Sequence, residues 1–475
     1  MSKTELTKVL SPLMLWGLGV GYVISGMYFG WNLGLAEGGT YGLAIATFFI
    51  IIMYITFTFS YTEMACAIPK AGGAFEYANR GLGKHFGFIA GIAQNIEFVF
   101  APPAISAAIG AYLNLLYPSV PLLIFAIGAY LIFTLINILG VKIAATFELV
   151  ITIFAVIELL IFAGVALPEL EYSNLQINPM PNGISGIFAA IPFAIWFFLA
   201  IEGVANVAEE AINPQRSILI GFGSAITTLV ILCVLTYTAA VGVGGWEAVV
   251  YPEGSDVASD SPLPLALGQI LDSSHVLYKL LIGIGLLGLI ASFHGIILAG
   301  GRAIMEFGRV GYAPKYLGNI HSKFKTPANA LVVNMLVGIV ALFTGKTAEI
   351  ITMACFGALV LYIVSMVAYL QLKKNEPEME RPFKAPMYPL FPMTALIIAS
   401  VALIAMSYYN PVIAVVFFAL VGLTYLYFLI FLNNKNFLTA NFNFNNATKF
   451  SLHVHDNLPN TYDSIVRNLN TETTH

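Results

Sequence analysis

The chain has 475 residues, of which 59% are hydrophobic and 10% charged, with a formal net charge of −4 and a mean hydropathy of +0.84. Because soluble domains carry about 25% charged residues, this composition excludes an ordinary soluble protein and indicates one that crosses a membrane many times. The three cysteines, Cys66, Cys233 and Cys355, are far apart in apolar sequence. This spacing predicts buried packing residues and no metal site.

The first apolar stretch, residues 15–35, reads LWGLGVGYVISGMYFGWNLGL. It is long enough to span a bilayer, since about 20 apolar residues cover the ~30 Å hydrocarbon core. Its glycines make a continuous helix unfavourable, and backbone that leaves the helix must be enclosed by protein. The stretch therefore predicts a broken span that lines a transporter binding site. The alternative is a helix that packs closely through its GxxxG pairs.

Hydropathy divides the chain into twelve apolar stretches. They predict an all-α polytopic membrane protein with twelve transmembrane helices in one domain, residues 1–432. The stretches are 13–35, 41–66, 86–113, 120–139, 144–167, 184–208, 216–243, 275–308, 327–344, 346–372, 389–408 and 411–432.

Several of these stretches contain ionisable residues that cost free energy in a membrane. Glu97 lies in the third stretch (GIAQNIEFVFAPPA) and Glu158 in the fifth. Glu148, nearer the inner end of the fifth, is expected to pair with Lys142 or to lie at the membrane interface. His294 in the eighth stretch (LIASFHGIILAG) is expected to be a packing residue, with a proton relay as the alternative.

The sixth stretch, IPFAIWFFLAIEGVANVAEEAINPQR, is the second one that is poorly suited to a continuous helix. Pro192 lacks a donor NH, Gly203 is flexible, and Glu202 places a carboxylate in apolar sequence. Trp196 either holds an ammonium group by cation–π attraction or packs against lipid or core. Two interrupted stretches, the first and the sixth, predict an inverted repeat with its binding site at the midplane.

The distribution of basic residues predicts that both termini are cytoplasmic. With that orientation nineteen Lys and Arg residues, Arg302 among them, fall on the inner side, and only Lys279 and Lys346 fall on the outer side. The polar start MSKTELTK, with no cleavage signature after the first stretch, predicts a retained span and not a signal peptide. Residues 433–475 are rich in Asn, Thr and Ser and predict a disordered cytoplasmic tail.

Four segments resemble motifs of the amino acid–polyamine–organocation (APC) transporter superfamily. They are GYVISGMYFG, IPKAGGAFEYANRGLG, AEEAINPQRSI and GGRAIMEFGRVGYAPKYLGNIHSKFKTP. The resemblance implies a LeuT-like fold, in which helices 1–5 and 6–10 form a 5+5 inverted repeat with helices 1 and 6 broken, plus two accessory helices. GVGYVISGMYFGWNLGL and FLAIEGVANVAEE are most similar to the ethanolamine permease group. A bacterial inner (plasma) membrane is the expected location.

The same resemblance implies a set of site residues. Met27 stands where the superfamily usually has a glycine that lets a substrate carboxylate approach, and Ala155 stands where some proton-coupled relatives carry a lysine. Coupling is then expected through Glu158, Glu97 or a sodium ion. The implied substrate-binding residues are Ser25, Gly26, Met27, Glu97, Trp196, Ala200, Ile201 and Glu202.

The resemblance implies a secondary active transporter that imports a small amine, most similar to an ethanolamine carrier, coupled to a proton or sodium gradient. The expected partners are the amine and the lipid bilayer, with no nucleic acid, no cofactor and no metal. An amino acid permease, a polyamine carrier, a passive channel and a non-transporting receptor on a carrier fold remain alternatives. A membrane enzyme is disfavoured, because the chain has no HxxxxD, HExxH or CxxC motif. The oligomeric state stays open.

Overall fold

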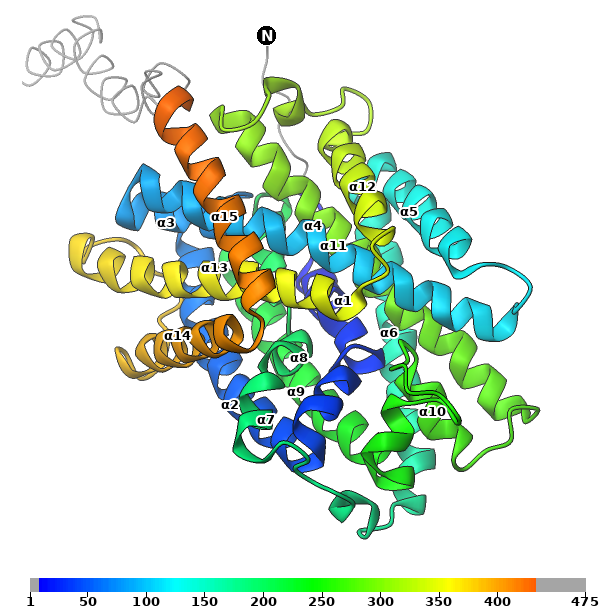
Figure 1. Ribbon diagram of the computed structural model, residues 1–475. Coiled ribbons are helices and arrows are strands. Elements are labelled where there is room, and N and C mark those ends of the chain that lie inside the picture. The colour runs from blue at the N-terminus through cyan, green and yellow to red at the C-terminus, as the bar shows by residue number, and fades with distance from the viewer. Residues whose placement is uncertain (1–7, 433–475) are drawn as a thin grey trace, which may run out of the picture. The chain divides into compact units, whose positions relative to one another are not determined.

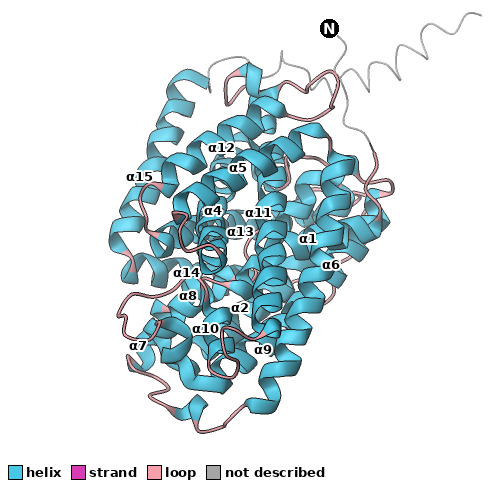
Figure 2. Ribbon diagram, turned by 90° about the vertical axis from the view of Figure 1, so that its right-hand side faces the viewer, coloured by secondary structure: helices cyan, strands magenta, loops and turns pink. Residues whose placement is uncertain are grey.

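A computed structural model describes residues 8–432, and these residues fold into helices joined by short loops (Figures 1 and 2). Figure 2 shows no strand among them, and their one strand-like pairing is an isolated bridge between Leu10 and Ala211. The predicted tail, residues 433–475, lies outside the described residues.

The helices follow one another closely along the chain. The first half contains α1 (Pro12–Tyr28), α2 (Trp31–Ala67), α3 (Ala74–Leu82), α4 (Lys84–Leu116), α5 (Leu122–Leu139), α6 (Val141–Ala166), η1 (Leu167–Glu169), η2 (Asn174–Gln176), α7 (Gly183–Ala189), α8 (Ile191–Trp196) and η3 (Ile201–Glu210). The second half contains α9 (Pro214–Val250), α10 (Pro262–Gly268), α11 (Val276–Val310), η4 (Lys315–Gly318), α12 (Ala328–Leu342), α13 (Thr347–Asn375), α14 (Leu390–Tyr409), α15 (Pro411–Tyr427) and the π-helix η5 (Phe428–Leu432).

Ten helical segments of the described chain are long and apolar enough to cross a membrane. Two shorter apolar helices, α1 and α12, coincide with the first and ninth predicted stretches. The prediction of an all-α polytopic membrane protein is therefore confirmed. The number of twelve spans and the inverted repeat stay predictions.

The first stretch forms two helices rather than one. Ser11 caps α1 by accepting a hydrogen bond from the amide of Met14 at 3.3 Å. The helix ends at Tyr28, because Phe29 is extended and Gly30 has φ +85°, a value that favours glycine. Helix α2 then begins, and it bends at Gly39. The glycine-rich sequence thus interrupts the helix after Tyr28.

The sixth stretch is interrupted as well. Pro192 lies at the start of the short helix α8, where its missing NH costs nothing. The chain then leaves the helix over residues 197–200, and Ala200 has φ +76°. It resumes as the 3₁₀-helix η3. The break therefore comes before Gly203, the residue that was expected to be flexible.

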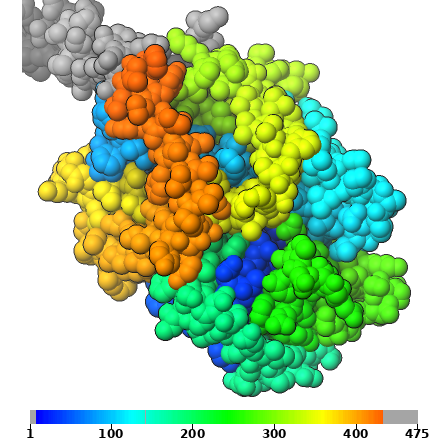
Figure 3. All heavy atoms as spheres, viewed as in Figure 1, coloured from blue at the N-terminus to red at the C-terminus, as the bar shows by residue number. Residues whose placement is uncertain are grey.

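Helix α1 lies in the interior of the helical assembly. It packs against α6, α9 and α11, while α13 runs beside α4 (Figure 1). Thirteen of its 17 residues are buried, and burial on all sides is typical of a core helix. In the space-filling view the blue N-terminal helices show only in limited areas between later ones (Figure 3). The core position brings the end of α1 next to the break in the sixth stretch.

Candidate functional site

Helix α1 meets the second helix break at Gly26. A Cβ atom at this position would collide with the carbonyl oxygen of Trp196 and with Cα of Phe197. The missing side chain therefore allows α1 to approach the backbone of the second break. The rings of Phe29 and Trp196 also pack edge to face, with centroids 5.4 Å apart. The buried Nε1 of Trp196 has no hydrogen-bond acceptor within residues 8–432.

Two buried carboxyl groups lie beside the second break. Glu202 is the second residue of η3, Glu97 lies in α4, and their carboxyl groups interact directly. Tyr362 of α13 donates a hydrogen bond to Oε2 of Glu202 at 2.9 Å, and its oxygen lies 3.1 Å from the hydroxyl of Tyr54. Among the described residues, neither oxygen of Glu97 receives a hydrogen bond. Because adjacent carboxylates repel each other, the pair favours a proton or a bound cation between them.

The remaining predicted residues lie in or next to the two breaks. Ser25 donates a hydrogen bond to Oγ of Ser292 at 2.7 Å, which in turn donates to the carbonyl of Tyr22 at 2.5 Å. Ser25 thus joins α1 to α11. Met27 and Ile201 are fully buried in the hydrophobic core. The structure therefore brings the eight predicted substrate-binding residues into one region, formed by the end of α1, the second break and α4.

Glu158 contacts the end of α1. The hydroxyl of Tyr28, the last residue of that helix, lies 2.6 Å from Oε2 of Glu158 and 3.0 Å from the carbonyl of Ala155. Tyr112 of α4 donates to the carbonyl of Tyr28 at 3.0 Å. Glu158 is 2% exposed, so this carboxyl group is enclosed by protein. It is linked to the first helix break through a single side chain.

The expectation that Glu148 pairs with Lys142 or lies at the interface is wrong. Glu148 is fully buried, and its Oε2 lies 2.8 Å from Nδ1 of His294, which is also fully buried. Lys142 is exposed. The pairing was missed because the partners are 146 residues apart in sequence. The one available signal was that both stretches carry an ionisable residue in apolar sequence.

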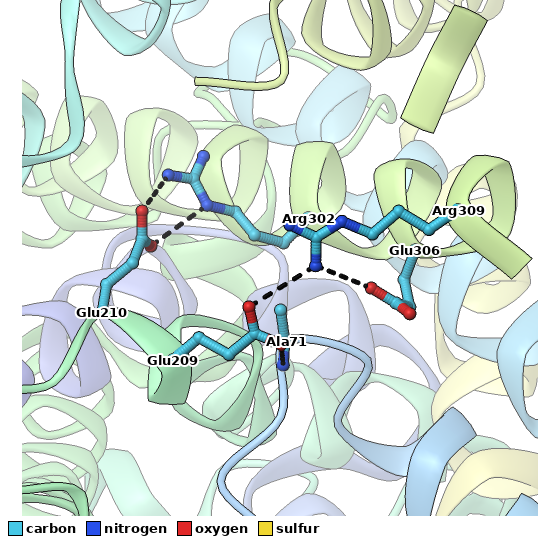
Figure 4. Close-up of polar contacts among 6 residues, drawn as sticks. All are labelled: Ala71, Glu209, Glu210, Arg302, Glu306 and Arg309. Carbon is cyan, nitrogen blue, oxygen red and sulfur yellow. Dashed lines mark hydrogen bonds and ion pairs between the residues drawn. The ribbon is translucent and has the colours of Figure 1, made fainter. Parts of the chain in front are cut away.

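A second buried ion pair joins η3 to α11 (Figure 4). Arg302 contacts the carboxylate of Glu210 through Nη2 at 2.8 Å and through Nε at 3.3 Å, and both side chains are fully buried. Sequence analysis counted Arg302 among the basic residues of the inner side, and the structure shows that its side chain is fully buried. The side chain is buried because α11 continues past it for two turns.

A partly exposed network adjoins this pair at the end of α11 (Figure 4). Nη1 of Arg309 lies 3.4 Å from Glu209 and 3.2 Å from Glu306. Glu209 also accepts a hydrogen bond from the amide of Ala71, in the turn between α2 and α3. These contacts join η3, the end of α11 and the turn between α2 and α3.

Glu76 in α3 adds a further acidic group to this end. The pKa of Glu76 is raised to about 7, mainly by burial and then by the Glu306 carboxylate, while Lys70 and Arg309 act against this rise. An acid whose pKa is higher in the folded state stabilises the protein below its unfolded pKa, near 4.5, and this stability is lost as pH rises through the folded pKa.

We therefore expect the free energy of unfolding to fall by up to about 3 kcal/mol between about pH 5 and about pH 8 through this group alone. The variant Glu76→Gln should lose that part of the pH dependence. Thermal unfolding of the purified protein at both pH values checks this, with the exposed Glu169→Gln as control. An identical pH dependence in the Glu76→Gln variant would contradict it.

The site region is enclosed, and a separate cavity lies elsewhere. The eight predicted substrate-binding residues are buried. A cavity of about 650 Å³ lies between α4, α13 and the α14–α15 turn, where Phe100, Met353 and Asn410 are among its lining residues. None of the predicted site residues lines it. Within residues 8–432, no cluster of three His, Cys, Asp or Glu side chains is arranged to hold a metal ion.

Comparison with protein families gives one match that covers most of the chain. Residues 13–445 match the model of the amino acid permease family. This range includes both helix breaks and every helix described above. Only the first residue of α1 lies outside it.

Comparison with individual proteins gives relatives of similar length and low identity. An uncharacterised transporter of Rhizobium meliloti is 26% identical over 419 residues, covering 85% of this chain and 87% of that protein. A branched-chain amino acid permease of Bacillus subtilis is 25% identical and covers 83% and 87%. A methylthioribose transporter of the same organism is 25% identical and covers 82% and 86%.

Proposed function

The chain belongs to the amino acid permease family and is a membrane transporter, and on that premise we propose that it imports a small amine, with ethanolamine as the first candidate. Transport is secondary active: the protein exposes the site to each side in turn and couples the amine to a proton or sodium gradient. The break that ends α1 and the second break, whose backbone contacts Gly26 of α1, support this assignment, because broken helices provide free backbone groups for a ligand.

The observation that carries the proposal is the pair of carboxyl groups, Glu97 and Glu202, beside the second break. An ammonium group between them would neutralise their repulsion, whereas a substrate carboxylate would increase it. Met27, in place of a smaller residue, narrows the approach to the backbone amides. The indole NH of Trp196, which lacks an acceptor among the described residues, could donate to the hydroxyl group of the amine.

Uptake of labelled ethanolamine into proteoliposomes tests the proposal, with alanine, GABA and putrescine as competitors. Separate proton and sodium gradients identify the driving ion. Saturable ethanolamine uptake that amino acids do not block is the expected result. If a neutral amino acid is taken up and ethanolamine is ignored, the substrate proposal is wrong and Met27 serves packing alone.

An amino acid permease is the second candidate. A curated relative that matches over most of the chain is named a branched-chain amino acid permease. Another relative of equal identity is named a methylthioribose transporter, so the names of the relatives point to more than one substrate class. The competition experiment above separates the two candidates, because only an amino acid permease would be inhibited by alanine.

We propose Glu158 and Glu97 as carriers of the coupling ion, with Glu158 as the first to be tested. The variant Glu158→Gln keeps the shape of the side chain and cannot be ionised. We expect the pH at which uptake is half-maximal to shift by about one unit, or the pH dependence to disappear. Uptake measured across a pH series checks this. The variant Tyr28→Phe removes the hydrogen bond and keeps the carboxyl group, so it is the matched control. An unchanged pH profile in Glu158→Gln would exclude Glu158.

A further inference from the structure

The buried pair of Glu148 and His294 is used by neither the proposed substrate site nor the proposed coupling residue. Both side chains are fully buried, in α6 and α11. The 2.8 Å between Oε2 and Nδ1 requires a proton between the two atoms, because two lone pairs would repel each other at that distance. Oε1 of Glu148 and Nε2 of His294 have no hydrogen-bond partner within residues 8–432. The pair therefore has two further atoms that can accept a proton.

The net charge of this pair depends on one proton. With a neutral imidazole and an ionised carboxylate, the pair carries one negative charge, and an isolated charge in the interior is costly. With one more proton, as a carboxylic acid beside imidazole or as a carboxylate beside imidazolium, the pair is neutral. A buried pair of this kind has a strong tendency to bind a proton whenever water reaches it.

The neighbours of the pair come from α1, α5 and α6. From α1, the missing side chain of Gly21 leaves room for Oε1 of Glu148, since a Cβ there would collide with it. From α5, Asn137 donates to the carbonyl of His294 at 3.0 Å. The rings of Phe147 on α6 and Phe133 on α5 pack against the imidazole, with centroids 5.3 Å and 6.2 Å away. These aromatic and amide groups do not titrate.

Tyr22 is the titratable side chain of α1 that lies beside the pair. This side chain of α1 packs where a Cβ of Gly295, the residue after His294, would lie. Its hydroxyl has no partner among the described residues, and it interacts electrostatically with Glu148, Arg302 and Glu210. Tyr22 thus lies close to both the Glu148–His294 pair and the buried ion pair between η3 and α11.

We propose that Glu148 and His294 form a proton-binding site, separate from Glu158, that takes up and releases one proton during the transport cycle. The inference rests on the proposed transport function. The site lies between α1, which ends at the first helix break, and α11, which carries the ion pair to η3. Loss of the proton leaves a negative charge that favours rearrangement around α1 and Tyr22, and uptake of the proton restores the neutral, closely packed state.

The test uses the full chain in proteoliposomes and the variants Glu148→Gln and His294→Gln. Both keep polar side chains that can form hydrogen bonds, and each removes one of the two groups that can take the extra proton. Counterflow of labelled ethanolamine at equal pH on both sides measures exchange without a gradient, and an imposed inside-alkaline gradient measures driven accumulation. We expect counterflow within about twofold of the wild type and driven accumulation reduced by about tenfold or more. The controls are the exposed Glu169→Gln and His275→Gln.

An infrared measurement that needs no substrate makes the outcome independent of the transport proposal. The C=O stretching band of protonated carboxyl groups is followed while pH is varied, and a component that titrates in the wild type should be absent in Glu148→Gln. If wild-type counterflow fails for every substrate while this component is present, the function proposal falls and the proton site stands. If the component is unchanged in Glu148→Gln, or driven accumulation survives in both variants, the proton site is wrong and the pair is structural.

Discussion

Replacing Glu202 by glutamine is expected to abolish amine uptake with little loss of stability. The variant removes the negative charge that would hold the ammonium group, yet its amide oxygen can still accept the hydrogen bond from Tyr362. Removing one partner of a desolvated charge pair costs about 2–5 kcal/mol, which corresponds to a loss of about 30-fold or more in uptake efficiency. Initial uptake rates over a range of ethanolamine concentrations measure this efficiency.

Two further variants separate charge from hydrogen bonding at this position. Glu97→Gln should cause a loss of similar size, and the double variant should lose less than the sum of the two, because both residues face one ligand. Tyr362→Phe removes the hydrogen bond and keeps both carboxyl groups, so a small effect is expected. If Glu202→Gln transports normally while Tyr362→Phe does not, Glu202 holds the helix break together and does not bind the substrate.

Replacing Arg302 by alanine is expected to give the largest loss of stability. The change leaves the carboxylate of Glu210 buried without its partner, and breaking a fully buried ion pair in this way costs about 3–5 kcal/mol. The same change at Arg309 should cost about 1 kcal/mol or less, because that side chain is 27% exposed and its pairs are solvated. Chemical or thermal unfolding of the purified variants measures the difference.

A compensating variant decides whether burial of a lone charge causes this loss. Arg302→Met combined with Glu210→Leu removes both charges and fills the space with apolar groups, so stability should return to within about 1–2 kcal/mol of the wild type. Equal losses for Arg302→Ala and Arg309→Ala would show that the buried pair does not stabilise the fold. A double variant as unstable as Arg302→Ala would show that shape, and not charge, is what the position requires.

The location of the apolar helices could be predicted from the sequence because hydropathy is a local property. Each predicted stretch contains a helix of the structure, and two irregular stretches contain the helix breaks. Pro192, Glu202 and Gly203 marked the sixth stretch as irregular, and the left-handed residue within it is Ala200. Alanine rarely adopts that conformation, so tertiary packing, here the contact of α1 with the backbone of Trp196, imposes it.

Pairing between distant side chains could not be predicted from the same information. Glu148 and His294, and likewise Glu210 and Arg302, are separated by whole helices in sequence. The sequence shows that each of these four side chains is costly to bury, but it does not show which acidic group pairs with which basic group. Arg302 was counted for the orientation of the chain, and no partner for it was predicted. The eight residues predicted to bind substrate were chosen from the resemblance. The structure places them in one region, and their role in binding stays a prediction.

Helix α11 gives these pairs a mechanical connection. It runs as one helix of 35 residues and carries Ser292, which contacts α1, then His294, then Arg302, which holds η3. At about 1.5 Å per residue, the contacts with α1 and η3 are about 15 Å apart on one stiff rod. A tilt of α11 at its contact with α1 would therefore also move its contact with η3. The helix itself, and not a chain of separate side chains, would connect the movements of the two broken segments.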